Sequence, residues 1–277
     1  MADDSHFGKQ LGLWLGAASD ALVSVFYPAG CQLCDQLLTR AGRVPICDHC
    51  LASFPALPAS VCEICGAPSA APFSSHAQPP LSLDYSSPAV RGCFQCQGRT
   101  YSFDRARSYA AYEGRLIRAI VLLKFERIEP LATWFAMRLA AVAKQQGLHA
   151  DVVVPVPLHR QREKERGYNQ AGLIARPLAR RLCLPYRAVL LTRTKPRPDK
   201  HILTMAERWE SVRGAFATRP GIQVDNLCVL LIDDVLTTGA TLDACARALL
   251  QAGAKSVIGL TIARAVKHPA NGSDALH

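Results

Sequence analysis

The sequence lacks an uninterrupted apolar run long enough to cross a membrane. Near the N-terminus, Asp20 breaks the apolar stretch well short of the about 20 residues that a span needs. The chain opens with acidic residues, unlike a signal peptide. Residues 1–27 instead have the apolar spacing of an amphipathic helix. The sequence therefore predicts a cytoplasmic protein without a transmembrane segment, with an N-terminal amphipathic helix at residues 1–27.

Aromatic and acidic residues are also scarce. Phe, Trp and Tyr make up 7% of the chain and lie mostly in apolar runs, so no obvious platform for stacking single-stranded nucleic acid is present. Residues 1–100 hold 5 basic and 7 acidic side chains, whereas residues 101–277 hold 27 and 15. The basic surface is therefore expected in the second part, where it favours phosphorylated metabolites, nucleic acid or anionic membrane.

The chain changes character near residue 100. The preceding residues are rich in Cys, Pro and Ser, with a flexible insertion expected at 66–92. The following pattern predicts strands at 108–113, 151–157, 187–193, 228–235 and 256–263, and helices at 115–125, 130–147, 169–182 and 241–254. This alternation predicts an α/β fold with a parallel sheet. The expected domains are a cysteine-rich module at 28–100, an α/β domain at 101–267 and a disordered tail at 268–277.

Eight of the eleven cysteines form Cys-x-x-Cys pairs: Cys31/Cys34, Cys47/Cys50, Cys62/Cys65 and Cys93/Cys96. Two such pairs complete a tetrahedral zinc site with no open position, so two structural Zn²⁺ ions are predicted. Sequential pairing gives loops of 12 and 27 residues, and a crossed pairing stays open. Disulfides are the alternative, and they require an oxidising compartment. The remaining Cys183, Cys228 and Cys245 lie in apolar contexts and are expected in the core.

One stretch, "VLLIDDVLTTGAT" at 229–241, combines three features of a ligand site. An apolar strand ends in two carboxylates, Asp233 and Asp234, and a Thr/Gly-rich turn leads into a helix. Backbone N–H groups at a helix N-terminus favour a phosphate, and carboxylates accept hydrogen bonds from vicinal hydroxyls. Ligands of open α/β sheets bind at the carboxyl ends of strands. The pattern indicates a ribose 5-phosphate, with an acidic helix cap as the alternative.

This stretch resembles the 5-phosphoribosyl-1-pyrophosphate (PRPP) signature of type I phosphoribosyltransferases. The resemblance implies that Asp233 and Asp234 hold the ribose hydroxyls, and that the 5-phosphate is cradled by Thr237, Thr238, Gly239, Ala240 and Thr241. The cysteine pairs, "LLKF" at 122–125, "VPVPLHRQREKERGYNQ" at 154–170 and the signature, in that order, are similar to the ComF family from about Pro28 to Arg264. That family implies a double zinc ribbon followed by a type I phosphoribosyltransferase (Rossmann-like) fold.

Further residues acquire expected roles from this resemblance. Arg162 and Arg166 follow the strand at 151–157 and would bind pyrophosphate with their guanidinium forks; the alternative is a solvated, mixed-charge helix start. Lys124 either faces the same anion or lies on an exposed helix end. Residues 193–216 would form a mobile loop that closes over the substrate. Positions that fit the family there are Arg193, Leu203, Arg208 and Phe216, and positions that depart from it are Arg197, Lys200 and Ser211.

The implied function is transfer of a 5-phosphoribosyl group from PRPP, with Mg²⁺, to an unidentified acceptor, as in a glycosyltransferase of the pentosyl type. Asp233, Asp234, Arg162 and Arg166 would act at the reaction centre, where negative charge builds on the departing pyrophosphate. Two other functions stay open. One is a competence or DNA-uptake accessory protein that binds single-stranded DNA. The other is a PRPP-sensing regulator without turnover, which would make the departures in the 193–216 loop meaningful.

Overall fold

The computed structural model of the protein describes residues 29–38, 44–68, 93, 95–96, 98–196, 204–222 and 224–265. The predicted N-terminal helix, most of the insertion at 66–92, the tail at 268–277, and Arg197, Lys200 and Leu203 lie outside the described residues. The contacts group the chain into two compact units, Met1–Phe54 and Pro55–His277. The four-part division of the sequence stays a prediction.

The described part of the first unit is built around two cysteine turns. An antiparallel bridge between Gly30 and Leu37 closes the first turn. The second turn leads into the short helix α2 (Asp48–Ala52), whose N-cap is Cys47; the Cys47 thiol accepts a hydrogen bond from the N–H of Cys50. Cys31, Ile46 and Cys50 are buried there. Few apolar side chains support these turns, so their stability depends on the cysteines.

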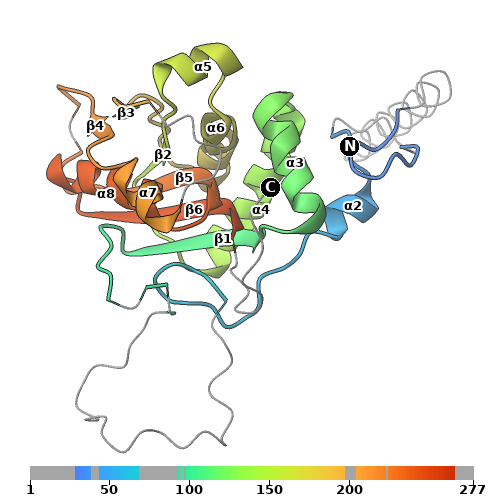
Figure 1. The fold of residues 1–277 in the computed structure, drawn as a ribbon, viewed down its shortest axis with the longest axis horizontal. Helices are drawn as coiled ribbons and strands as arrows, with labels where there is room; N and C mark the ends of the chain where they lie inside the picture. Colours follow the sequence, from blue (N-terminus) through green and yellow to red (C-terminus); the bar gives the residue numbers. More distant parts are fainter. Residues whose placement is uncertain are drawn as a thin grey trace, which may run out of the picture. The chain divides into compact units, whose positions relative to one another are not determined.

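The second unit contains a four-stranded sheet in which all neighbours run parallel (Figure 1). In space the order is β1-β6-β5-β2. The strands are β1 (Arg105–Ala111), β2 (Val152–Pro155), β5 (Cys228–Leu236) and β6 (Ser256–Arg264). Parallel strands require long crossover connections, and the helices between them supply these. The predicted α/β fold with a parallel sheet is confirmed.

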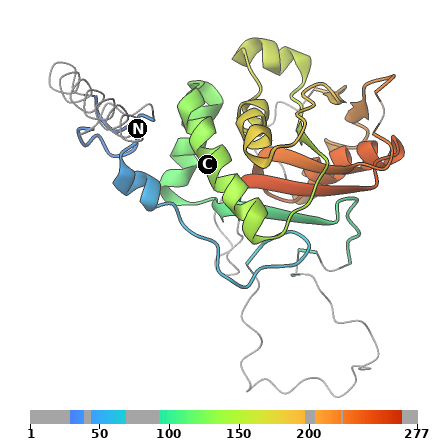
Figure 2. The ribbon, with the colours of Figure 1, turned by 180° about the vertical axis from the view of Figure 1, so that it is seen from behind.

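Helices cover both faces of this sheet (Figures 1 and 2). They are α3 (Gly114–Phe125), α4 (Glu129–Gln145), α6 (Gln170–Leu182) and α8 (Ala240–Gln251). α8 packs with Val229 and Leu231 on one face of β5, and α6 packs on the other. Successive side chains of a strand alternate between faces, so the end of β5 can present one residue to each layer. No helix within the described ranges combines the length and apolarity of a membrane span.

Four short elements differ from the sequence expectation. Only β3 (Leu191–Arg193) of the predicted strand 187–193 forms, and it pairs antiparallel with β4 (Phe216–Thr218), outside the parallel sheet. α5 (Arg160–Arg166) forms between the predicted strand 151–157 and the predicted helix 169–182, and α7 (Met205–Glu210) forms within the predicted 193–216 loop. α5 buries no residue, so it lacks the apolar periodicity from which a helix is predicted. A helix does form around Arg162, and the pyrophosphate-binding role of Arg162 and Arg166 stays a prediction.

The three cysteines outside the pairs have different surroundings. Cys245 in α8 is fully buried, as expected of a core residue. Cys228 is half-buried at the start of β5. Cys183 is exposed, so its expected core position is wrong. It ends α6 as the C-cap in the left-handed conformation, which turns its side chain out of the apolar face of the helix.

Residues 55–68 lie along β1, which is an edge strand of the sheet. The N–H of Ala111 donates to the carbonyl of Pro55 at 2.8 Å, and the N–H of Ala106 donates to that of Ile64 at 2.7 Å. Gly66, at φ +65°, fits closely here, because a Cβ would lie 2.8 Å from the carbonyl oxygen of Ala106. The Cys62–Gly66 turn is therefore attached to the sheet and covers part of its edge.

Candidate functional site

The two carboxylates at the end of β5 face opposite sides of the sheet. Asp234 is only 6% exposed and points toward α3 and α6. Asp233 lies on the α8 side: burial, and after it the charge of Asp233, raises the pKa of the Cys245 thiol. The strand alternation that separates them follows from the extended backbone. The pair therefore offers one carboxylate to each helical layer.

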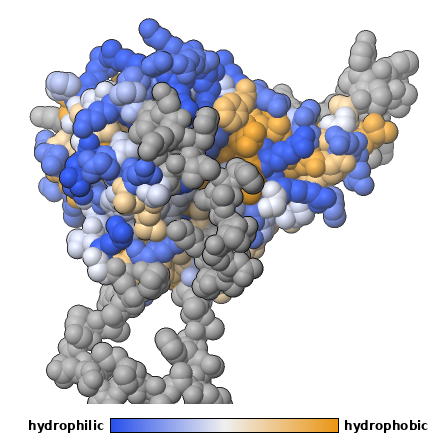
Figure 3. Space-filling view, in the orientation of Figure 1, coloured by the Kyte–Doolittle hydropathy of each residue, from blue (hydrophilic) through white to orange (hydrophobic). Residues whose placement is uncertain are grey.

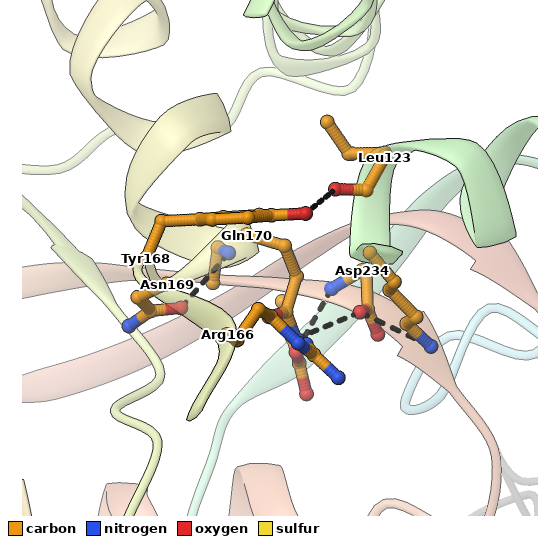
Figure 4. Close-up of polar contacts among 9 residues, drawn as sticks. Leu123, Arg166, Tyr168, Asn169, Gln170 and Asp234 are labelled. Atoms are coloured by element: carbon orange, nitrogen blue, oxygen red, sulfur yellow. Dashed lines mark hydrogen bonds and ion pairs between the residues drawn. The ribbon is translucent and has the colours of Figure 1, made fainter. Parts of the chain in front are cut away.

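Asp234 is held by side chains from two helices (Figure 4). The ammonium of Lys124, at the end of α3, lies 3.2 Å from Asp234 Oδ2. Gln170, the first residue of α6, donates from Nε2 to the same oxygen at 3.0 Å. Gln170 in turn accepts a hydrogen bond from the guanidinium of Arg166. Lys124 thus faces an acidic residue of the predicted site and does not lie on a merely solvated helix end.

Of the two arginines predicted to bind pyrophosphate, one lies in this network. Arg166 is half-buried, which lowers the pKa of its guanidinium. Its guanidinium also lies 5.1 Å from the centre of the Phe125 ring, so packing restricts its position. Arg162 is exposed on α5, and no contact brings it to Asp234.

The turn between α5 and α6 is fixed by buried polar contacts. Gly167 ends α5 in the left-handed conformation, at φ +78°. The hydroxyl of Tyr168 donates to the carbonyl of Leu123 at 3.0 Å and accepts from the N–H of Arg127 at 2.9 Å. Asn169 caps α6 and donates to the carbonyl of Val156 at 3.0 Å. These bonds hold α6 against β2 and the end of α3, which positions Gln170 and Lys124 beside Asp234.

The predicted phosphate loop, Thr237–Thr241, joins β5 to α8. Gly239 is the N-cap of α8 at φ +82°, and a Cβ there would lie 3.1 Å from Cε1 of Tyr101. The hydroxyl of Thr238 accepts from the N–H of Ala240 at 3.3 Å. Arg208, on α7, donates to the hydroxyl of Thr237 at 3.3 Å. The first-turn N–H groups of a helix have no partners within the helix, so this loop presents donors suited to an anion.

Other residues of the predicted 193–216 loop have structural contacts. The guanidinium of Arg193 lies 5.2 Å from the centre of the Phe216 ring, across the β3–β4 pair. Ser211, a departure from the family pattern, ends α7 and donates to the carbonyl of Arg208 at 2.9 Å. Its hydroxyl therefore supports the helix that carries Arg208.

The sequence analysis missed three residues that contact the Thr237–Thr241 loop or the first turn of α8. Asp243 is 1% exposed and accepts from the N–H of Ser102 at 2.6 Å and from Arg247 at 2.9 Å. Arg264 is also 1% exposed and donates to the carbonyls of Leu236 and Thr237. Tyr101 lies against Gly239. The sequence offered little signal for them, because Arg264 only ends the mostly apolar segment 256–264, as many surface arginines do.

The eight paired cysteines come together in two groups of four, each with thiol sulfurs within 4.8 Å of one another. The pairing is sequential: Cys31/34/47/50 and Cys62/65/93/96. Four Sγ–Sγ distances are 3.8 and 3.7 Å in the first group, and 3.9 and 3.6 Å in the second. A zinc ion about 2.3 Å from four sulfurs makes a tetrahedron with edges of about 3.8 Å. Each group could therefore hold one metal ion.

The surroundings of the two groups favour thiolates and not disulfides. All eleven cysteines are free, and the sulfurs stand well beyond the about 2.05 Å of a disulfide. In each group the third cysteine donates its backbone N–H to the first, Cys47 to Cys31 and Cys93 to Cys62, both at 3.3 Å. The hydrogen bond between Cys62 and Cys65 lowers the pKa of the Cys62 thiol and raises the pKa of the Cys65 thiol, so it favours one thiolate in that pair. Thiolates are the form that binds a metal.

The surface near Asp234 is mixed. Figure 3 shows hydrophilic residues over α5 and hydrophobic residues gathered over α3. α3 exposes Ile117, Val121 and Phe125, at one helical turn's spacing, with Phe125 68% exposed. α3 therefore has an exposed apolar side next to a charged network.

The chain is similar in sequence to known proteins that share a phosphoribosyl transferase domain or are linked by name to DNA use and competence. A family model described as a phosphoribosyl transferase domain matches residues 168–274, and with the parallel sheet it defines a protein with a type I phosphoribosyltransferase-like domain. The DNA utilization protein YhgH of Salmonella typhimurium is 30% identical over 203 residues, which cover 72% of this chain and 81% of that protein. The competence protein ComFC of Bacillus subtilis is 29% identical over 227 residues, 79% of this chain and 84% of that protein. The chain belongs to the ComF/YhgH family.

Among solved structures, the glutamine PRPP amidotransferase of B. subtilis aligns with 47% of this chain and 26% of its own, at 20% identity and a TM-score of 0.33. The assignment to the family rests on the sequence relatives.

Proposed function

We propose that this protein binds PRPP together with Mg²⁺ at the carboxyl end of β5 and transfers the 5-phosphoribosyl group to an acceptor. One observation carries the proposal: the single β5–α8 junction has a carboxylate on each face of the sheet and, three residues on, an N–H-rich turn at a helix N-terminus. A ribose 5-phosphate has a matching arrangement, with vicinal hydroxyls beside an anion.

Different residues of the β5–α8 junction would bind different groups of PRPP. Thr237–Thr241 would bind the 5-phosphate, with Gly239 allowing close approach of the backbone. Asp233 and Asp234 would accept hydrogen bonds from the ribose hydroxyls. Oδ2 of Asp234 is bonded to Lys124 and Gln170, whereas Oδ1 has no partner within the described ranges. That second oxygen supports a role in accepting a ligand hydroxyl.

In the transfer step, the bond from ribose C1 to the pyrophosphate oxygen breaks and a bond from C1 to the acceptor forms. The electron pair of the broken bond leaves with the pyrophosphate, so negative charge builds there. Arg166 and Lys124 lie on the Asp234 side and would stabilise it. Arg208, on α7, would add charge at the phosphate loop. Mg²⁺, when bound, would neutralise negative charge on the departing pyrophosphate.

Each four-cysteine group is proposed to hold one structural Zn²⁺. Four thiolates fill a tetrahedral site and leave no position for a substrate. The Sγ–Sγ distances and the N–H donors to Cys31 and Cys62 support this assignment.

The test is a calorimetric titration of the full-length, zinc-loaded protein with PRPP, with and without Mg²⁺. Magnesium-dependent binding is expected in the wild type and not in the Asp233→Asn/Asp234→Asn variant. Asp151→Asn is the matched control, because Asp151 binds the N–H of Cys228 at the opposite end of β5. No binding at millimolar PRPP would contradict the proposal, and release of pyrophosphate with candidate acceptors would separate turnover from sensing.

A second candidate function is binding of single-stranded DNA. It is favoured by the names of the relatives, a DNA utilization protein and a competence protein, and by the excess of basic residues in 101–277. Phosphate contacts predict binding that weakens steeply with salt. Fluorescence anisotropy with a labelled oligonucleotide at rising salt would measure this, and no binding at low salt would remove the candidate.

A further inference from the structure

Arg264 joins the second cysteine group to the predicted phosphate loop. Toward the cysteines, its Nε donates to the carbonyl of Cys65 at 3.0 Å, and Nη2 lies 3.3 Å from the Cys65 sulfur. Nη2 also donates to Gln95, between Cys93 and Cys96, at 2.8 Å. Toward the loop, Nη1 donates to the carbonyls of Leu236 at 3.0 Å and Thr237 at 2.6 Å. One rigid guanidinium therefore contacts both sites.

The charge of Arg264 depends on the cysteines for compensation. Its side chain is 1% exposed, and no carboxylate pairs with it in the part of the chain that the structure describes. Burying an unpaired guanidinium is costly. A zinc ion with four thiolates carries net negative charge, and Cys65 places that charge against Nη2. A metal-filled cluster therefore stabilises the observed position of Arg264, and loss of the metal removes the fixed arrangement of that charge beside Nη2.

The bonds of Arg264 also orient the loop amides. In a planar trans peptide the C=O and the following N–H point in opposite directions. With the carbonyls of Leu236 and Thr237 turned to Arg264, the N–H groups of Thr237 and Thr238 point away from it. Without Arg264 the carbonyl of Leu236 would keep the N–H of Ala265, at 2.9 Å, whereas the carbonyl of Thr237 would lose its bond at 2.6 Å. The peptide plane between Thr237 and Thr238 could then rotate, which would remove the alignment of the Thr238 N–H.

The segment at Tyr101 and Ser102 makes a second connection between the second cysteine group and the phosphate loop. Tyr101, five residues after Cys96, packs against the second cysteine group and lies against Gly239 of the loop. The next residue, Ser102, donates its N–H to Asp243 in the first turn of α8. The segment that leaves the cysteine group thus supports the N-terminus of α8 directly.

We propose that Arg264 is a positioning residue through which the metal of the second cysteine group fixes the backbone at 236–241. Loss of that metal disorders the loop and weakens binding of the 5-phosphate, although the metal itself contacts no ligand. The statement about ligand affinity rests on the proposed function, whereas the coupling between cluster and loop does not.

The test measures amide hydrogen exchange in peptides covering 236–241, in the full-length protein without ligand, together with zinc content and PRPP affinity. Arg264→Lys keeps the charge and loses the fork. It is expected to retain both metal ions, to exchange about tenfold faster in this segment, and to bind PRPP about tenfold more weakly. Arg107→Lys is the matched control: Arg107 donates to the carbonyl of Glu63, in the same cysteine turn, and does not reach the loop.

If Arg264→Lys loses metal or fails to fold, the wild type with and without metal still tests the proposal. Removing all metal from the wild type should raise exchange at 236–241, whereas Cys34→Ser, which disrupts only the first group, should not. Equal exchange in the loaded and metal-free wild type would overturn the proposal, as would wild-type exchange in a zinc-retaining Arg264→Lys. If exchange responds but the wild type binds no PRPP, the proposed function fails and the coupling stands.

Discussion

Asp233 and Asp234 are neighbours in the chain but have different surroundings. Asp234 is buried beside Lys124 and Gln170, and Asp233 faces α8. The pairing with Lys124 is an ion pair with limited solvent access, 24% and 8% exposed. Pairs of this kind are costly to break on one side, because the remaining charge stays buried.

Replacing Lys124 with methionine is expected to lower the free energy of unfolding by about 1–3 kcal/mol, because Asp234 then lacks its cation. Arg213→Met is the control, since its pair with Glu210 is 78% and 68% exposed, and such pairs contribute about 0–1 kcal/mol. Urea unfolding measures both. Equal losses would mean that Lys124 does not stabilise Asp234.

Gly239→Ala tests the close approach to Tyr101. The left-handed conformation alone costs a non-glycine residue about 1–2 kcal/mol. Gly221→Ala, at φ +79° with no atom within 4 Å of the added Cβ, carries only this cost. Gly239→Ala adds a contact at 3.1 Å, so it is expected to be the more destabilising in urea and to weaken PRPP binding. A Gly239→Ala variant as stable as Gly221→Ala would show that the Tyr101 ring moves aside without cost.

Among the helices and strands, those that are long and have a periodic apolar pattern were predicted from the sequence, and the short or charged ones were not. α4, α6 and α8 have apolar faces that bury residues such as Leu139, Ile174 and Leu249, so their patterns predicted them within a few residues. Every residue of α5 except Gln161 is charged, and β3 and β4 have three residues each. Elements that bury little leave no periodic signal.

The same distinction holds for the candidate site. Asp233, Asp234 and the Thr237–Thr241 loop lie in one continuous stretch, so their types and spacing were readable. Arg264 and Tyr101 reach the loop only through the tertiary fold. Arginine at a strand end is otherwise an ordinary surface residue, and the sequence does not reveal that it is buried.

α7 owes its start to a capping box, in which the Thr204 hydroxyl accepts from the N–H of Glu207 and Glu207 accepts from the N–H of Thr204. Thr204→Ala removes one bond of the box, a change that typically costs about 1 kcal/mol. Because a six-residue helix has little else to hold it, hydrogen exchange within 205–210 should rise and PRPP affinity should fall, since Arg208 contacts Thr237 from α7.

Thr133→Ala is the control for this change. Thr133 is an exposed helical threonine of α4 whose hydroxyl donates to the carbonyl of Glu129. Neither PRPP affinity nor exchange in 205–210 should respond to it. An unchanged α7 in Thr204→Ala would contradict the role given to the capping box.

At the scale of the whole molecule, the two cysteine groups belong to different compact units, Met1–Phe54 and Pro55–His277. Cys65→Ser should remove one metal ion and lower the thermal midpoint of the sheet-containing unit by about 5 °C or more. Cys50→Ser, at an equally buried position of the first group, should remove one metal ion and leave that midpoint unchanged. Calorimetry with metal analysis distinguishes the two, and equal shifts would contradict the assignment.

The strip at 55–68 along β1 has a practical consequence for anyone shortening this chain. A fragment that starts at Tyr101, where the α/β pattern begins, would leave the N–H groups of Ala106 and Ala111 without the carbonyls that now receive them. A bare strand edge recruits strands from other molecules, so such a fragment should form oligomers and precipitate, while one that starts at Pro55 should not. The segment that carries Cys62 and Cys65 thus also keeps one copy of the protein from polymerising with the next.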